Sequence, residues 1–279
     1  MAKIPQRKIH DYLRHDKKFP HVWCAGCSNG IVLGAVIRAI DELKLNRDNI
    51  VMVSGIGCSS RMPVYVDFNT LHSLHGRAIA FATGVKMYKP GMKVIVITGD
   101  GDATAIGGNH FIHAARRNLD LTVVLLNNNI YGMTGGQYSP ATPHGDKATT
   151  TPYGNIDPNF DICKLAIGAG ASHVARTTAF HAIELQKQIK EALEHPGFSL
   201  VEAICACPVI YGRLNKKGDA PAMMRNMRDN SIPIKAAEKL PPEQVAGKIL
   251  RGTFIKEVRA EYTDAYQKMM DQLSPKEGE

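Results

Sequence analysis

The chain has 279 residues, of which 44% are hydrophobic and 22% are charged, a composition typical of one large globular domain or of one domain with an appendage. Six cysteines are too few for a disulfide-rich scaffold, and the longest apolar runs, 94–97 and 121–126, are far too short to cross a bilayer. The net charge of +8 comes without a zinc-finger spacing or an arginine-rich run, so neither nucleic acid nor a membrane is an expected partner. Residues 1–18 lack the apolar core of a secretory signal, and we expect a cytoplasmic protein.

Short β-branched runs alternate with helical segments along most of the chain up to residue 205. Strands that alternate with helices usually pair in parallel, because parallel neighbours need a crossover connection between them. The pattern therefore predicts an α/β fold, a doubly wound parallel sheet with helices on both faces. The expected strands are 51–54, 94–98, 122–126, 173–176 and 199–205, and the expected helices are 75–88, 108–117, 162–167 and 179–195.

The character of the sequence changes after Cys207. Residues 208–250 are rich in Lys, Arg, Met and Pro without a sustained period, and a polar segment near 258–273 has helical character. We therefore expect one domain over residues 1–210 and a C-terminal extension over 211–279 that wraps around it or acts as a lid.

Side chains with oxygen atoms follow two neighbouring predicted strands. Asp100, in the segment TGDGD, comes shortly after strand 94–98, and Asn128 follows strand 122–126. If one helix crosses between these strands, both side chains project from the sheet edge where open α/β sheets bind ligands. Mg²⁺ prefers hard oxygen ligands together with phosphate oxygens and water, and the adjacent glycines let a phosphate approach the backbone. These residues predict a magnesium-bridged diphosphate held by Asp100, Asn128 and the carbonyl of Ile130.

The same residues carry a resemblance to a known family. GDG at 99–101, followed at the usual distance by NN at 127–128, is similar to the thiamine diphosphate motif. The longer segment NNNIYGMTGGQ and the upstream segment HSLHGRA at 72–78 resemble the β subunit of 2-oxoacid:ferredoxin oxidoreductases. The resemblance implies the thiamine-diphosphate-binding fold, with thiamine diphosphate and Mg²⁺ as cofactors.

Four of the six cysteines are placed where they could share a metal centre. Cys24 and Cys27 form a CxxC, and Cys58 and Cys207 each follow a predicted strand. From the residues alone, a [4Fe–4S] cluster, a structural zinc ion, a thioredoxin-like pair and inert buried thiols are all open. The family resemblance implies that Cys24, Cys27, Cys58 and Cys207 ligate a [4Fe–4S] cluster and that Cys205 is a strand residue outside this set. The ferredoxin run CxxCxxCxxxCP is absent from the sequence, so we expect one cluster at most.

The resemblance also implies an activity. A thiamine diphosphate ylide adds to a 2-oxoacid and takes up the electron pair left after CO₂ departs, and a nearby one-electron acceptor is then needed to oxidise the product. The family passes the acyl group to coenzyme A and the electrons through the cluster to ferredoxin, in this direction or in reverse. A chain with one sheet leaves no room for the pyrimidine-binding half of such an enzyme, so we expect an α subunit that carries it, in an αβ or α₂β₂ assembly.

Further site residues are implied by their positions in the family motifs. His75 would reach the diphosphate, with His72 as an equally polar competitor. Arg61 and Met133 would face the substrate, because a guanidinium can pair with a distal carboxylate and GMTGGQ is similar to the 2-oxoglutarate or broad-specificity type. We therefore expect 2-oxoglutarate as substrate, ahead of pyruvate and branched-chain 2-oxoacids. The other expected contacts are Ile56, Gly57, Cys58 and Ser59 along the cofactor, Gly101 and Asp102 at its phosphates or bound waters, and Gly132 and Met133 under its thiazolium.

Two other classes of protein share part of this pattern. A non-oxidative thiamine-dependent decarboxylase component would use GDG and NN but would have no use for four placed cysteines. A zinc-stapled binding protein would explain the cysteines but would leave Asp100 and Asn128 without a role. A dinucleotide-binding enzyme is disfavoured, because no GxGxxG follows the first predicted strand.

Overall fold

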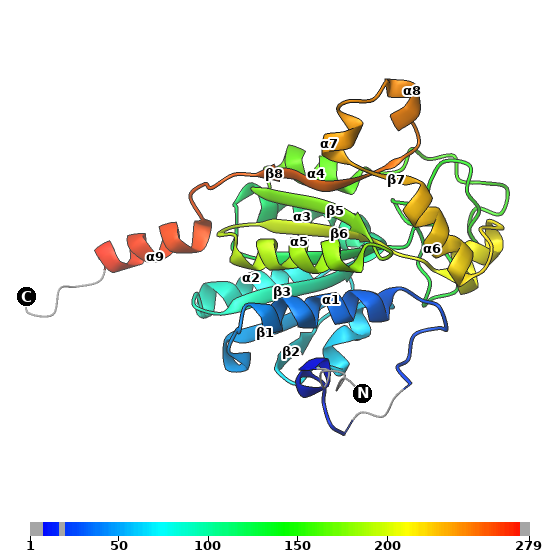
Figure 1. The fold of residues 1–279 in the computed structure, drawn as a ribbon. Helices are drawn as coiled ribbons and strands as arrows, with labels where there is room; N and C mark the ends of the chain where they lie inside the picture. The colour runs from blue at the N-terminus through cyan, green and yellow to red at the C-terminus, as the bar shows by residue number, and fades with distance from the viewer. Residues whose placement is uncertain (1–7, 17–19, 274–279) are drawn as a thin grey trace, which may run out of the picture.

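An eight-stranded sheet forms the centre of the computed structural model, which describes residues 8–16 and 20–273 (Figure 1). The strands lie in the order β2-β1-β3-β4-β6-β5-β8-β7. Neighbouring strands are parallel except for β5 and β8, which are antiparallel. The bounds of the strands are β1 Ile50–Ser54, β2 Asn69–His72, β3 Lys93–Gly99, β4 Thr122–Asn127, β5 His173–Thr178, β6 Ser199–Ile204, β7 Ser231–Pro233 and β8 Ile249–Lys256.

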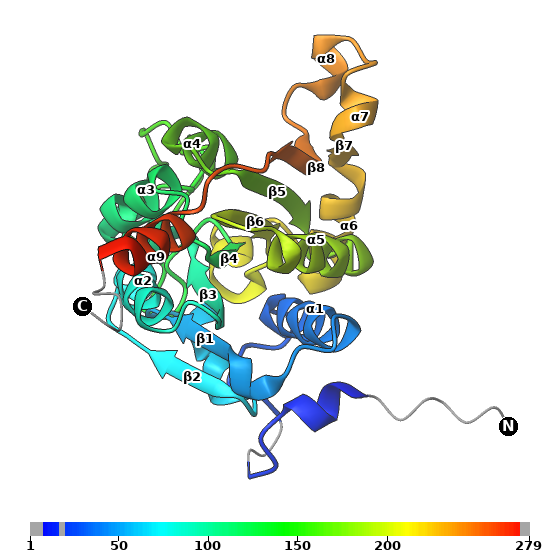
Figure 2. The same ribbon diagram turned by 90° about the vertical axis from the view of Figure 1, so that its left-hand side faces the viewer.

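Helices cover both faces of the sheet, as Figures 1 and 2 show. On one face, α1 (Asn29–Glu42) and α5 (Ala182–Glu194) pack against each other and against the strands. On the other face lie α2 (Ala78–Tyr88), α3 (Gly108–Arg116) and α4 (Ile162–Ala169). Strands β3, β4 and β6 are therefore buried on both sides, which is why β3 and β4 read as nearly continuous apolar runs, whereas Glu202 interrupts β6. The predicted doubly wound α/β fold is confirmed.

Two elements near the N-terminal side of the fold escape the sequence prediction. Helix α1 is buried at eight of its fourteen positions, so its apolar residues do not trace one clear stripe. Strand β2 is a four-residue edge strand, NTLH, that is exposed or half-buried throughout. The helix expected over 75–88 begins only at Ala78, because Gly76 has a φ of 66° and belongs to the preceding turn.

The C-terminal segment wraps along the far edge of the sheet. There the predicted parallel sheet gains one antiparallel neighbour, because β8 runs antiparallel to β5. Strand β8 is half-buried or exposed along its length, so it lacks the apolar run that reveals an inner strand. Whether residues 211–279 form a separate unit stays a prediction. The helices of this segment are α6 Ala220–Asp229, α7 Ile234–Ala237, α8 Pro242–Val245 and α9 Tyr262–Leu273, of which α9 projects away from the body (Figure 1).

Within residues 8–16 and 20–273, none of the helices combines the length and the apolarity that a bilayer span requires. The expectation that residues 1–18 carry no secretory signal falls partly on residues outside the described ranges.

Candidate functional site

The loops that follow β1, β2, β3 and β4 meet at the carboxyl edge of the sheet and enclose a cleft of about 110 Å³. Complete small-molecule sites usually measure about 300–1,000 Å³, so this chain encloses part of a site. The cleft is lined by all of the residues that the sequence places at the cofactor or at Mg²⁺, whereas Arg61 lies outside its walls. These lining residues are Ile56, Gly57, Cys58, Ser59, His75, Asp100, Gly101, Asp102, Asn128, Ile130, Gly132 and Met133.

Asp100 is a buried carboxylate without a cationic partner. Its side chain is 2% exposed, and Ser139 donates a hydrogen bond of 2.5 Å to its Oδ2 atom. Among the described residues, no lysine, arginine or histidine forms an ion pair with Asp100. Burial raises the pKa of this carboxyl to about 7, although the hydrogen bond from Ser139 opposes the shift. A divalent cation beside Asp100 would supply the missing positive charge.

The turn after β4 presents Asn128 and Ile130 to the same cleft. Asn127 accepts a hydrogen bond from the backbone N–H of Asn129 through Oδ1 (3.1 Å), and Asn128 accepts one from Ile130 in the same way (3.3 Å). Asn129 has a φ of 62°, in the left-handed region that asparagine tolerates better than most residues. Thr142 fixes the turn further by donating to the Asn129 carbonyl at 2.6 Å. Residues 127–130 therefore form a turn at the cleft whose conformation is held by side-chain hydrogen bonds.

The donor set fits a magnesium-bridged diphosphate. One carboxylate, one side-chain amide and one backbone carbonyl are the hard oxygen ligands that Mg²⁺ takes beside phosphate oxygens and water. Gly101 gives the cleft room, because a Cβ at this position would lie 2.2 Å from the ring of Tyr131. The Tyr131 hydroxyl in turn donates to the Gly101 carbonyl at 3.0 Å. The individual roles of Asp100, Asn128 and Ile130 stay predictions.

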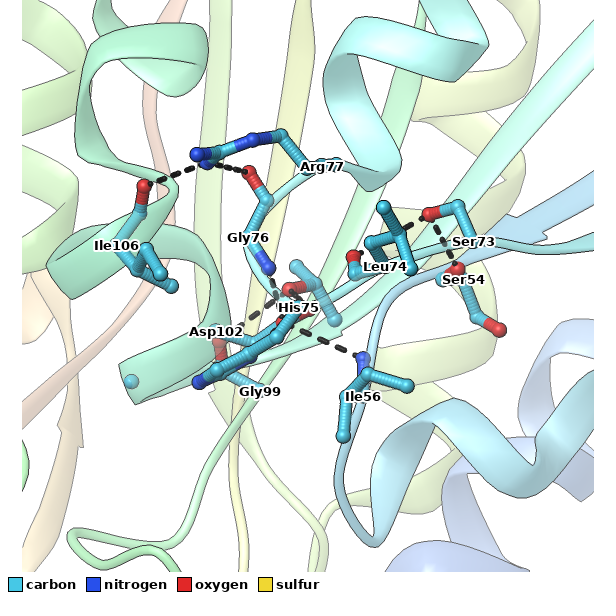
Figure 3. A network of polar contacts seen from close by, with 12 residues as sticks. Ser54, Ile56, Ser73, Leu74, His75, Gly76, Arg77, Gly99, Asp102 and Ile106 are labelled. Atoms are coloured by element: carbon cyan, nitrogen blue, oxygen red, sulfur yellow. Dashed lines mark hydrogen bonds and ion pairs between the residues drawn. The ribbon is translucent and has the colours of Figure 1, made fainter.

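Asp102 holds three loops of the site together (Figure 3). Its Oδ1 atom accepts hydrogen bonds from the backbone N–H groups of Ile56 (3.3 Å) and Gly76 (2.8 Å) and contacts His75 Nδ1 at 2.5 Å. Its Oδ2 atom accepts from the hydroxyl of Thr98 at 2.8 Å. Because both carboxylate oxygens accept hydrogen bonds from within this chain, the Asp102 side chain holds the loops of the site in place. The expected contact of Asp102 with phosphate or water stays a prediction.

His75, not His72, is the histidine at the cleft. His72 is exposed at the end of the edge strand β2, whereas His75 lines the cleft and packs edge-on against Tyr131 at 5.9 Å between ring centroids. Because Nδ1 faces Asp102, the Nε2 atom is the one left to meet a ligand (Figure 3). The position of Nε2 is therefore compatible with a contact between His75 and a diphosphate. That contact stays a prediction.

The four selected cysteines gather on the other side of Gly132. A Cβ added to Gly132 would lie 3.6 Å from the sulfur of Cys58 and 3.7 Å from that of Cys207. Burial, with smaller contributions from the sulfurs of Cys207, Cys58 and Cys24, raises the pKa of Cys27 to about 11, so the four side chains are neighbours. Cys205 is also near Cys27 and Cys207, but it is buried, whereas the other four are partly or fully exposed.

Across the described residues, no three His, Cys, Asp or Glu side chains are close enough to share a single metal ion. A structural zinc ion holds its sulfurs about 2.3 Å from one point. A [4Fe–4S] cluster spreads its four thiolates over a larger inorganic core. Whether Cys24, Cys27, Cys58 and Cys207 hold a cluster stays a prediction.

Hydrogen-bond donors of the backbone and of Trp23 lie around two of the thiols. The N–H groups of Asn29 and Met133 donate to the sulfurs of Cys27 and Cys58. Trp23 donates from Nε1 to the Cys58 carbonyl at 2.6 Å and so ties the CxxC segment to the loop after β1. N–H groups aimed at sulfur stabilise negative charge there, and they tune the reduction potential of iron–sulfur clusters.

Arg61 lies at the rim of the cleft. Its side chain is exposed, and its Nη2 atom is 3.9 Å from the sulfur of Met133, which lines the cleft. The structure therefore brings together the two residues that the sequence assigns to substrate choice. Their contact with a substrate stays a prediction.

Three contributors to the site escape the sequence reasoning: Ser139, Tyr131 and Trp23. Tyr131 and Trp23 stand inside motifs that carry the resemblance, NNNIYG and WCAGC, so their positions alone are a signal. Ser139 lies in a Gly/Pro-rich loop, and its contact with Asp100 spans 39 residues. No local pattern reports a contact of that kind.

The chain is similar to known proteins along most of its length. Residues 55–203 match the family model described as thiamine pyrophosphate enzyme, C-terminal TPP binding domain. The 2-oxoglutarate synthase subunit KorB of Methanocaldococcus jannaschii is 48% identical over 94% of this chain and 97% of its own length. A 2-oxoacid:ferredoxin oxidoreductase subunit beta from Sulfolobus is 44% identical over 70% of this chain and 64% of its own. The chain belongs to this family of β subunits.

A solved structure extends the similarity to the fold of the whole chain. A chain of the 2-oxoglutarate:ferredoxin oxidoreductase from Magnetococcus marinus, with 2-oxoglutarate, coenzyme A and succinyl-CoA bound, matches 100% of this chain and 94% of its own with a TM-score of 0.86 and 36% identity. The family membership that the motifs imply is thereby confirmed, and with it the thiamine-diphosphate-binding fold. The non-oxidative and zinc-stapled alternatives are not favoured by these relatives.

Proposed function

We propose that this chain is the cofactor- and cluster-binding β subunit of a 2-oxoglutarate:ferredoxin oxidoreductase. It would act in the coenzyme A-dependent oxidative decarboxylation of 2-oxoglutarate to succinyl-CoA, or in the reverse reaction. The observation that carries the proposal is the position of Gly132. It lies on the cofactor cleft and within contact distance of two of the four grouped thiols.

The residues at the cleft have complementary roles in this proposal. Asp100, Asn128 and the Ile130 carbonyl would hold Mg²⁺, and His75 Nε2 and the backbone at Gly101 would meet the diphosphate. Bound thiamine diphosphate supplies the ylide and the electron sink for decarboxylation. Met133 and Gly132 would lie beside the reacting ring and exclude water from it.

The thiols would hold the electron acceptor next to the cofactor. We assign Cys24, Cys27, Cys58 and Cys207 to one [4Fe–4S] cluster, and ferredoxin is the proposed electron carrier beyond it. Cys24 is exposed, so the cluster would approach the surface on that side. All six cysteines are free, which suits a reducing cytoplasmic location.

An α subunit is the proposed partner. The cleft that this chain encloses is small, and the loop beside it carries large apolar side chains in contact with solvent: Tyr153 is 99% exposed and Ile156 is 83% exposed. Exposed apolar side chains next to an incomplete site are typical of a protein interface. The pyrimidine-binding half would cover this loop and complete the site.

Metal and sulfide analysis tests the cluster and the partner together. The chain is expressed anaerobically with its α subunit and by itself. We expect about four irons and four acid-labile sulfides per β subunit in the complex, with activity only when both subunits are present. Zinc in place of iron, or full activity of the isolated chain, would refute the proposal.

Substrate choice is tested at Arg61. Replacing Arg61 by Ala in the complex should raise the apparent KM for 2-oxoglutarate at least tenfold, because the distal carboxylate loses its charged partner, and should change the KM for pyruvate little. Arg225→Ala, at an exposed arginine on α6, is the matched control. Equal effects on both substrates would remove the basis for the 2-oxoglutarate assignment.

A further inference from the structure

A buried ion pair joins two central strands beneath the metal-binding turn. Glu202 on β6 is 1% exposed, and its Oε2 atom accepts a hydrogen bond of 2.6 Å from Nε of Arg176 on β5. The two residues are direct register partners on adjacent parallel strands. The Arg176 guanidinium also donates to Asp161, at the start of α4, at 2.5 Å. Arg176 therefore holds one oxygen of Glu202, and Asp161 in turn holds Arg176.

The other oxygen of Glu202 reaches the asparagine run. Asn127 donates from Nδ2 to Oε1 of Glu202 at 2.8 Å, and its Oδ1 atom accepts from the N–H of Asn129 at 3.1 Å. A carboxylate with both oxygens occupied by donors can only accept, so it fixes which end of the Asn127 amide is the NH₂. That orientation leaves the amide oxygen facing the turn that carries Asn128 and Ile130.

This arrangement is costly as a structural device. The pair lies under α4, among apolar residues such as Leu125, Leu200 and Ile162, each at most 2% exposed. Well-packed apolar residues in place of such a buried pair are often neutral or even stabilising. The stability of the sheet therefore does not explain why charged residues stand at positions 176 and 202. Orienting the side-chain amide of Asn127 beside the proposed magnesium site does explain it.

We propose that Glu202, held by Arg176, is a positioning residue that sets the side-chain orientation of Asn127 and thereby the turn that presents Asn128 and Ile130 to the cation. The inference rests on the proposed magnesium–diphosphate site. Glu202 touches neither cofactor nor substrate; it acts through Asn127.

The test compares two variants of the co-purified αβ complex. Glu202→Gln puts an amide, which can donate as well as accept, opposite Asn127, so the asparagine is free to flip. Asp161→Asn removes a negative charge beside Arg176 but keeps an oxygen that accepts its hydrogen bond, so Arg176 still holds Glu202, and asparagine still caps α4. The readouts are the affinity for Mn²⁺ in the presence of thiamine diphosphate, followed by electron paramagnetic resonance, and the melting temperature of the metal-free complex.

We expect Mn²⁺ to bind at least tenfold more weakly to E202Q and within twofold of wild type to D161N. A purely structural role predicts lowered melting temperatures with unchanged Mn²⁺ affinity, and that result would overturn the inference. If E202Q does not fold, Asn127→Ala is measured in its place, and wild-type Mn²⁺ affinity in that variant would also overturn it. Absence of Mn²⁺ binding to the wild-type complex would instead refute the proposed function on which the inference rests.

Discussion

Asp102 shows how one residue can serve a site by organising its loops. Four donors converge on its carboxylate, from the loops after β1 and β2 and from the end of β3. Replacing Asp102 by Ala leaves four donors without this partner, and two of them, the N–H of Gly76 and the hydroxyl of Thr98, are buried. We expect the free energy of unfolding to fall by about 3 kcal/mol, since each buried donor left unpaired costs about 1–3 kcal/mol before relaxation. Urea unfolding of the metal-free complex measures the loss.

A matched variant separates this role from ligand contact. His75→Asn keeps a side-chain N–H near the position of Nδ1, so the bond to Asp102 can persist, but it removes Nε2. We expect little change in stability and at least tenfold weaker binding of thiamine diphosphate, measured by titration. If His75→Asn destabilises the protein as much as Asp102→Ala does, His75 is part of the scaffold and not a contact of the diphosphate.

His173 makes stability depend on pH far from the cleft. This histidine is fully buried on β5, and neither ring nitrogen has a hydrogen-bond partner among residues 8–16 and 20–273. Burial lowers its pKa from 6.5 to about 4, and the nearby His195 and Lys256 add to the shift. The unfolded chain therefore takes up a proton first as the pH falls. The contribution of neutral His173 to the free energy of unfolding is full above pH 6.5. It falls by up to about 3 kcal/mol between pH 6.5 and pH 4.

Removing the titrating group checks this assignment. His173→Phe should flatten the decline of the unfolding free energy between pH 6.5 and pH 4, because phenylalanine binds no proton and fills a similar volume. His144→Asn, at an exposed histidine, should leave the pH dependence as it is in the wild type. An unchanged slope in His173→Phe would assign the acid sensitivity to other groups.

At the scale of single elements, helix α2 contains a glycine, Gly84, that could be replaced by a better helix former. Gly84 lies inside the helix and is exposed, and a Cβ there would meet nothing within 4 Å. Gly84→Ala should therefore stabilise the protein by about 0.5–1 kcal/mol, through helix propensity alone. The comparison is Gly107→Ala, where a Cβ would lie 2.3 Å from the Asp102 carbonyl and should destabilise. Thermal melting measures both, and a destabilised Gly84→Ala would mean that this face of α2 is covered in the complex.

The elements also show which parts of the protein a sequence can report. Asp100 and Asn128 were predictable because each follows a strand buried on both faces, and the carboxyl ends of parallel strands share one edge. Strand β2 was not, because a short edge strand carries little apolar patterning. Glu202 reads as an interruption of a strand, and only the contact with Asn127, 75 residues away, gives it a place near the site. Local sequence patterns therefore predict the strands and the residues that follow them, but they do not predict polar contacts between residues far apart in the sequence.

At the scale of the whole molecule, the C-terminal segment closes the edge of the sheet. Strand β8 covers β5, which is buried at every position except the half-buried Arg176. Phe254 on β8 packs against the Arg176 guanidinium, whose CZ atom is 5.3 Å from the ring centroid. Glu261 accepts hydrogen bonds from the N–H groups of Asp120 and Thr263, so it anchors the start of α9 to the loop after α3.

Truncation separates an appendage from a structural part of the domain. A chain that ends at Asn230 exposes the β5 edge and its apolar neighbours, and we expect it to be recovered largely as aggregate without a cooperative melting transition. A chain that ends at Ala260 keeps β8 and loses the projecting helix together with its anchor Glu261, so its melting temperature should stay within a few degrees of the full-length value. Both are compared after co-expression with the α subunit. If the shorter chain melts like the full-length protein, residues 231–279 are a separable extension; if it does not, the sheet edge depends on them.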